Sequence, residues 1–262
     1  ECGEEPEVVR KDTARKLVCN IQGGTVGENV SHLFEGLKLG LVGSLEKRSQ
    51  ILGRDAVWTK TSSVSKLSPY LCVQYMRFFW KATPDSADHT GVKCKIMRPV
   101  SFTDTLDVFP YCNAELQAAI KANRDRLGEK VDIKTTEDEP EAKKAKSGEA
   151  MDVEEPDEDL AAALALSMED DSAVKHRELL ESCGLDKDFQ GHYELFAIVT
   201  HKGRSADGGH YMGWVKREDG SWLVFDDDLV SESSWEFVQG LKGGGDEHMS
   251  YLQFYRAKKG GI

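Results

Sequence analysis

The sequence predicts an α+β protein, because helical and strand-like patterns occur in the same 262-residue chain. Apolar residues recur at helical spacing over 30–41 and 114–127, whereas strand-like runs crowd the stretch from residue 193 to residue 255. A strongly acidic segment lies between these regions. We therefore expect one folded α+β unit with an inserted linker and a short helix.

The first region, 1–135, mixes helix and strand. Val30–Leu41 and Ala114–Leu127 each place apolar residues on one side of a helix, although two glycines weaken the first pattern. Tyr70–Trp80, with the sequence YLCVQYMRFFW, is rich in aromatic and β-branched residues between two prolines. It predicts one buried strand.

The acidity belongs to one segment. Between Thr136 and Asp171 lie 14 acidic and three basic residues, so this stretch carries −11 of the formal net charge of −12. Residues 136–156 hold no aromatic residue and few aliphatic ones, which predicts a disordered linker. Because the remainder is almost neutral and has no broad basic face, a nucleic-acid partner is disfavoured.

Beyond the linker, 157–171 predicts a short alanine–leucine helix and 172–189 a connecting helix stopped near Gly184. The last region, 190–262, predicts four strands separated by glycine-rich turns.

One histidine and one aspartate are the candidate catalytic residues. His210 opens one predicted strand and Asp226 closes the next, with the turn Glu218–Gly220 between them. Antiparallel pairing would bring the two side chains together, and a carboxylate beside an imidazole fixes its tautomer and stabilises its cation. A histidine–aspartate pair across a hairpin is, however, more often structural than catalytic, so the pattern alone leaves both interpretations open.

The cysteines give no metal or disulfide signature. Six are scattered without a CxxC pair, so we expect neither a metal nor another cofactor. No signal peptide, long apolar run or lipidation motif is present, which predicts an intracellular protein without a membrane partner. The chain begins Glu-Cys-Gly, without an initiator Met, and we expect it to be a fragment.

The string THKGRSADGGHYMGWVKREDGSWLVFDDDLVS (200–231) resembles the histidine box of the ubiquitin-specific protease family. Two further segments support the resemblance, namely Gly243–His248 (GGGDEH) and Pro69–Phe79 with its Arg-Phe-Phe end. Within the family, the GRS…GHY part of the histidine box and the segment Gly243–His248 look like those of the proteasome-associated member.

This resemblance implies a papain-like cysteine protease fold, represented by its palm and fingers without the thumb. It implies that His210 is the general base, that Asp226 orients it, and that Gly209 and Tyr211 line the channel for the ubiquitin tail. It also implies a thiol-dependent deubiquitinase. No cysteine here matches the family's nucleophile motif, so that residue is expected outside this chain and the fragment alone is expected to be inactive.

The short helix resembles a ubiquitin-interacting motif. Leu160, Ala163, Leu164 and Ser167 lie on one helical face after an acidic run. Expected partners are therefore ubiquitin, polyubiquitin conjugates and the proteasome, and a noncatalytic ubiquitin-binding fragment is the alternative function. The expected location is the cytoplasm and also the nucleus, although Lys143–Lys146 is a poor import signal in an acidic run.

Overall fold

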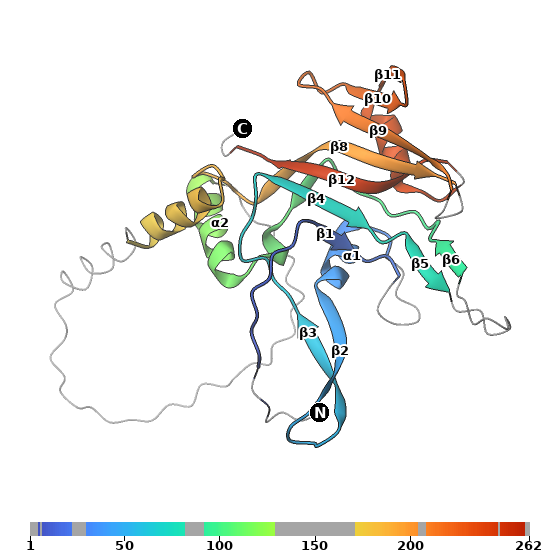
Figure 1. Ribbon diagram of the computed structural model, residues 1–262. Coiled ribbons are helices and arrows are strands. Elements are labelled where there is room, and N and C mark those ends of the chain that lie inside the picture. The colour runs from blue at the N-terminus through green and yellow to red at the C-terminus, as the bar shows by residue number, and fades with distance from the viewer. Residues whose placement is uncertain are drawn as a thin grey trace, which may run out of the picture.

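The computed structural model describes residues 5, 7–22, 30–81, 92–128, 171–203, 208–245 and 247–259. Its centre is a sheet of eight strands (Figure 1). Along the sheet the strands are β1 (Leu17–Cys19), β4 (Tyr70–Tyr75), β12 (Met249–Ala257), β8 (His192–Lys202), β9 (His210–Lys216), β10 (Trp222–Asp226) and β11 (Leu229–Ser233), with β7 (Thr105–Asp107) paired to β8 off this path.

The sheet joins the two ends of the chain. β12 lies between β4, from the first region, and β8, from the last, and both pairings are antiparallel. Phe254, for example, is opposite Cys72 on one side and Ala197 on the other. The regions on either side of the acidic segment therefore form a single sheet.

Two helices lie where the sequence predicts them. The helix α1 (Leu33–Gly40) begins at His32 with a capping box to Glu35, and α2 (Ala114–Leu127) begins at Asn113 and ends at Gly128 in the left-handed conformation. A further helix spans residues 171–182. Buried residues of α1 and α2 pack in the same hydrophobic core as β4, β8 and β12.

The expected single strand over 70–80 is instead two strands. β4 ends at Tyr75, and β5 (Phe78–Lys81) pairs with β6 (Val92–Lys95) in a separate sheet. The strand is interrupted at Met76 and Arg77. The Arg77 side chain is fully buried there and donates hydrogen bonds to carbonyl groups of other segments. A strand extended through this point would not provide these bonds.

Several elements are not visible in the sequence patterns. The strands β2 (Val42–Arg48) and β3 (Asp55–Thr61) form a hairpin that extends away from the main sheet (Figure 1). The remaining short helices are η1 (Phe109–Tyr111), α4 (Trp235–Gln239) and η2 (Gly240–Lys242).

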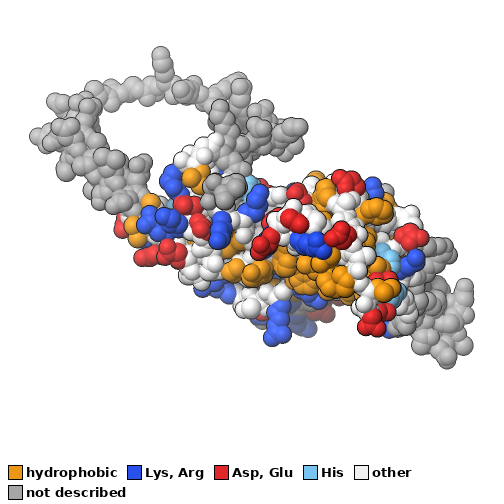
Figure 2. Space-filling view, turned by 90° about the horizontal axis from the view of Figure 1, so that it is seen from above, with side chains coloured by type: hydrophobic (Ala, Val, Ile, Leu, Met, Phe, Trp, Pro, Cys, Tyr) orange, Lys and Arg blue, Asp and Glu red, His pale blue; other side chains and the backbone are white. Residues whose placement is uncertain are grey.

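One face of the main sheet carries an apolar strip. Figure 2, viewed from above Figure 1, shows hydrophobic side chains gathered along the middle of the molecule. Val215, Phe225 and Val230 are among the large hydrophobic residues that remain exposed. Among the described residues, no helix is both long and apolar enough to cross a membrane.

Candidate active site

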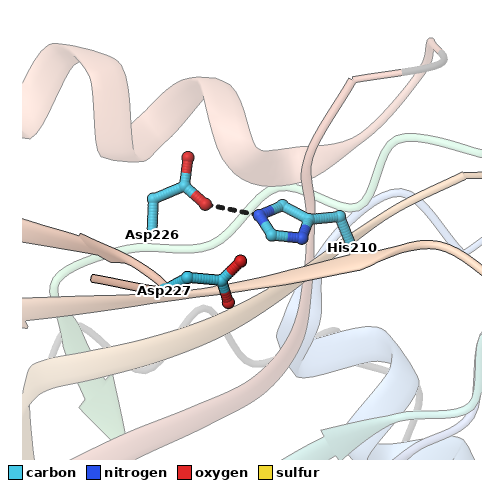
Figure 3. A group of neighbouring side chains, drawn as sticks. All are labelled: His210, Asp226 and Asp227. Carbon is cyan, nitrogen blue, oxygen red and sulfur yellow. Dashed lines mark hydrogen bonds and ion pairs between the residues drawn. The ribbon is translucent and has the colours of Figure 1, made fainter. Parts of the chain in front are cut away.

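The ends of two neighbouring strands place His210 beside Asp226. His210 is the first residue of β9, and Asp226 is the last residue of β10, its antiparallel neighbour. Because Phe225 is opposite Gly213, Asp226 reaches His210 diagonally across the hairpin. Figure 3 shows the carboxylate of Asp226 pointing at the imidazole ring.

The two side chains are hydrogen-bonded through His210 Nε2 and Asp226 Oδ1. This bond, together with the negative charges of Asp226 and Asp227, raises the pKa of His210 above its usual range. Both side chains are about two-fifths exposed, so a substrate can reach them. Since Nε2 is engaged by the carboxylate, Nδ1 is the ring nitrogen able to take a proton from a nucleophile.

Asp227 supplies a second carboxylate near the ring. Its φ of 50° is the only positive value recorded for a non-glycine residue in the described chain, and it lies in the tight turn from β10 to β11. Ligand atoms of His210, Asp226 and Asp227 lie within 4.8 Å of one another, a spacing that would allow a metal ion. The hydrogen bond from His210 to Asp226 suits a proton-transfer pair equally well.

A second histidine, His248, packs against the ring of His210. The His248 ring meets it edge to face, with 5.9 Å between centroids. His248 Nδ1 lies 3.2 Å from the hydroxyl of buried Thr200, which also accepts a hydrogen bond from Trp214. Burial and the nearby positive charges of Lys202 and His210 lower the pKa of His248, so this ring is neutral at pH 7.

Gly209 and Tyr211 flank His210 in the chain, and both lie against His201. Gly209 has a φ of 140°, and a Cβ there would lie 2.3 Å from His201 Nε2, so only glycine fits. Tyr211 is half-exposed and packs on His201, with 4.7 Å between ring centroids. Because side chains alternate along β9, Tyr211 lies on the opposite face from His210. The structure thus places Gly209 against His201, and does not bring Tyr211 to the His210–Asp226 pair.

The cysteines of the described chain are not paired with His210. Cys19, Cys72, Cys94, Cys112 and Cys183 are free thiols. Burial raises the pKa of both Cys19 and Cys112 to about 12, which makes these two poor nucleophiles. Among the residues that the structure describes, no hydrogen bond joins a cysteine to His210.

Other predicted segments lie outside the described residues. These are Leu160, Ala163, Leu164 and Ser167 of the predicted ubiquitin-interacting helix, and the acidic linker over 136–156. Sequence reasoning assigned no role to Thr200, His201 or His248. The segment GGGDEH, already noted for its resemblance, is the signal that would have drawn attention to His248.

Comparison with known proteins identifies relatives over nearly the whole chain. The profile of the family described as ubiquitin carboxyl-terminal hydrolase matches residues 2–255. "Ubiquitin carboxyl-terminal hydrolase 6" of Arabidopsis thaliana is 39% identical over 98% of this chain and 49% of its own length. "Ubiquitin carboxyl-terminal hydrolase 14" of Caenorhabditis elegans is 33% identical over 98% of this chain and 47% of its own length.

The chain therefore spans about half the length of the curated relatives it matches. Among solved structures, the yeast SAGA DUBm is similar with a TM-score of 0.47 and 18% identity, covering 94% of this chain and 36% of that chain. The SAGA DUB module bound to monoubiquitin gives the same values.

Proposed function

Because this chain belongs to the ubiquitin carboxyl-terminal hydrolase family, with its papain-like α+β fold, we propose that it is the histidine-bearing part of a thiol-dependent deubiquitinase. The observation that carries the proposal is the hydrogen bond between His210 Nε2 and Asp226 Oδ1 at the ends of adjacent strands. This arrangement can hold an imidazole ready to activate a thiol.

In this proposal the nucleophilic cysteine lies outside this chain. Nδ1 of His210 takes the thiol proton, and the thiolate attacks the carbonyl carbon of the bond after the C-terminal glycine of ubiquitin. The resulting imidazolium, stabilised by Asp226, gives its proton to the leaving amine as that bond breaks. Water then hydrolyses the thioester, releasing ubiquitin and the free thiol.

The test is hydrolysis of a fluorogenic ubiquitin C-terminal amide. We compare this chain alone with the same chain joined to the N-terminal half of its own protein, which we call the joined protein. Cleavage by the joined protein and not by this chain alone is the expected result. Equal cleavage by both would place the nucleophile within this chain and overturn the split arrangement.

A noncatalytic ubiquitin-binding role is the second candidate, because the sequence spacing of Leu160, Ala163, Leu164 and Ser167 predicts that they share one helical face. A single short helix face gives a Kd of roughly 0.1–1 mM. Ala163→Asp on that face should abolish binding of the helix to ubiquitin chains, whereas Ala162→Asp on the opposite face should not. Unchanged binding by Ala163→Asp would contradict the proposal that this helix binds ubiquitin.

The proposed partners are ubiquitin, polyubiquitin conjugates and the proteasome, in the cytoplasm and nucleus. The support is the resemblance of Gly243–His248 and of the histidine box to the proteasome-associated member of the family. Co-purification of the tagged protein with proteasomes, tested in cytoplasmic and nuclear fractions, checks both points. Recovery without proteasome subunits would contradict the partnership.

A further inference from the structure

A buried lysine lies beneath the chain segment that leads into His210. Lys95, at the end of β6, is only 8% exposed. Its Nζ lies 2.7 Å from His201 Nδ1 and donates hydrogen bonds to the carbonyl oxygens of His201, at 3.0 Å, and Gly203, at 2.8 Å. Lysine is almost never buried to this degree unless its charge is satisfied. Here the three acceptors together satisfy the ammonium group.

The contact with Lys95 fixes the tautomer of His201. An ammonium group has only donors, so Nδ1 of His201 must accept and the ring proton must lie on Nε2. The His201 side chain is in turn hydrogen-bonded to the backbone of Gly208. Burial and the charge of Lys95 lower the pKa of His201, which keeps this ring neutral.

Burial, and secondarily the nearby charge of Arg77, also lowers the pKa of Lys95 to about 8. The ammonium form therefore predominates at pH 7.

Both ends of the segment between β8 and β9 meet at this pair. Lys95 binds Gly203 at the end of β8, and His201 binds Gly208 just before β9. A Cβ on Gly203 would lie 3.1 Å from the Cα of Gly209, so the two ends touch. Gly209 itself lies against His201 Nε2 and precedes His210 directly. His201 thus lies against Gly208 and Gly209, the two residues that precede His210 in the chain.

We propose that Lys95 and His201 are positioning residues, a buried clamp that holds Gly208 and Gly209 so that His210 stays in hydrogen-bonding reach of Asp226. The inference rests on the proposed function for its catalytic meaning. Its structural content, the coupling of a buried pair to the geometry of His210, can be measured without ubiquitin or a nucleophile. The clamp acts through backbone, and neither residue touches the reacting atoms.

The test is the titration of the His210 ring, followed by nuclear magnetic resonance in the full 262-residue chain. His210→Gln assigns the signal among the seven histidines. In the parent chain the His210 pKa should lie above its ordinary value of about 6.5, because the hydrogen bond to Asp226 and the charges of Asp226 and Asp227 outweigh desolvation and the charge of Lys202. Lys95→Met and His201→Phe should both return it toward about 6.5, because a displaced His210 loses the bond to Asp226.

A matched control is Asn123→Leu. Asn123 is also buried and donates to two backbone carbonyls, those of Lys187 and Phe189, but it lies on α2. This change removes comparable hydrogen bonds and should leave the His210 titration unaltered. His201→Gln, which keeps a donor for Gly208, should restore most of the raised pKa. Should Lys95→Met not fold, His201→Phe keeps the ring packed on Phe78 and Tyr211 and carries the test.

A parent-like His210 pKa in folded Lys95→Met or folded His201→Phe would overturn the proposal. In the joined protein, His201→Phe should lower kcat by about 10–100-fold with little change in KM, because positioning is lost and ubiquitin contacts are kept. A change confined to KM would likewise contradict it. Since the titration needs no cleavage, an inactive joined protein with the expected titration would count against the proposed function alone.

Discussion

Replacing Arg77 with methionine should destabilise the whole fold. The Arg77 side chain is fully buried and donates to the carbonyl oxygens of Ser250 (2.7 Å), Ile96 (3.2 Å), Arg98 (3.0 Å) and Lys242 (3.0 Å). These carbonyls come from β12, from the chain after β6 and from η2, so one guanidinium group joins three segments. Methionine keeps most of the volume and removes every donor.

The expected loss follows from the orphaned carbonyls. The Lys242 carbonyl keeps the hydrogen bond that it accepts from the Val100 N–H, so three carbonyls lose their Arg77 donor without that replacement. Each buried polar group left without a partner costs about 1–3 kcal/mol, so three would cost about 3 kcal/mol or more. Part of this is offset because a cation no longer has to be desolvated. We therefore expect the free energy of unfolding to fall by about 3–5 kcal/mol, a large share of the roughly 5–15 kcal/mol typical of a domain.

Urea denaturation of the full chain, followed by tryptophan fluorescence at pH 7, measures this loss. Arg217→Met is the matched control, because the Arg217–Glu232 ion pair has side chains that are 40% and 79% exposed. It should change the free energy of unfolding by less than about 0.5 kcal/mol. A loss below about 1 kcal/mol for Arg77→Met would refute the argument that these carbonyls depend on Arg77.

Iodoacetamide at pH 8 should label Cys94 and Cys72 faster than Cys19 and Cys112, because burial raises the pKa of the last two to about 12; equal labelling by mass spectrometry would contradict this. The raised pKa of His210, caused first by its hydrogen bond to Asp226, contributes stability that is present below about pH 6.5 and lost as the pH rises through the folded-state value. Asp226→Asn should therefore destabilise the fold more at pH 5.5 than at pH 8.5, and equal losses in urea melts would count against the pairing. Glu194 accepts hydrogen bonds from Lys216 on β9 and Arg256 on β12, so Glu194→Ala should lower the free energy of unfolding by about 1–2 kcal/mol. An unchanged urea melt would show that these two bonds do not stabilise the fold.

The sequence patterns predicted those features that depend on residues close together in the chain. The spacing of apolar residues predicted α2 from Ala114 to Leu127. The structure adds its ends, with Asn113 as a hydrogen-bonding cap and Gly128 as the residue that follows the helix. The juxtaposition of His210 and Asp226 was also predictable, since a short turn joins their strands. The wider sheet was not, because pairing β12 with both β4 and β8 depends on contacts between residues far apart in sequence.

The missed features share a physical cause. Each residue of β2 is exposed, so the hairpin has no alternation of buried and exposed positions to reveal it. Lys95 and Arg77 are buried cations, and charged side chains are expected at the surface. Apart from the His201 ring beside Lys95, their partners are backbone carbonyls, which leave no trace in the sequence. The break after Tyr75 and the clamp beneath His210 therefore required the structure.

The most direct measurement of the central claim is cleavage of the fluorogenic ubiquitin amide by the joined protein carrying His210→Ala. His176→Ala, in the helix over 171–182, is the matched histidine control. We expect kcat to fall by about a thousandfold or more for His210→Ala and to stay unchanged for His176→Ala. Retention of parent-like cleavage by His210→Ala would contradict the assignment of His210 as the general base.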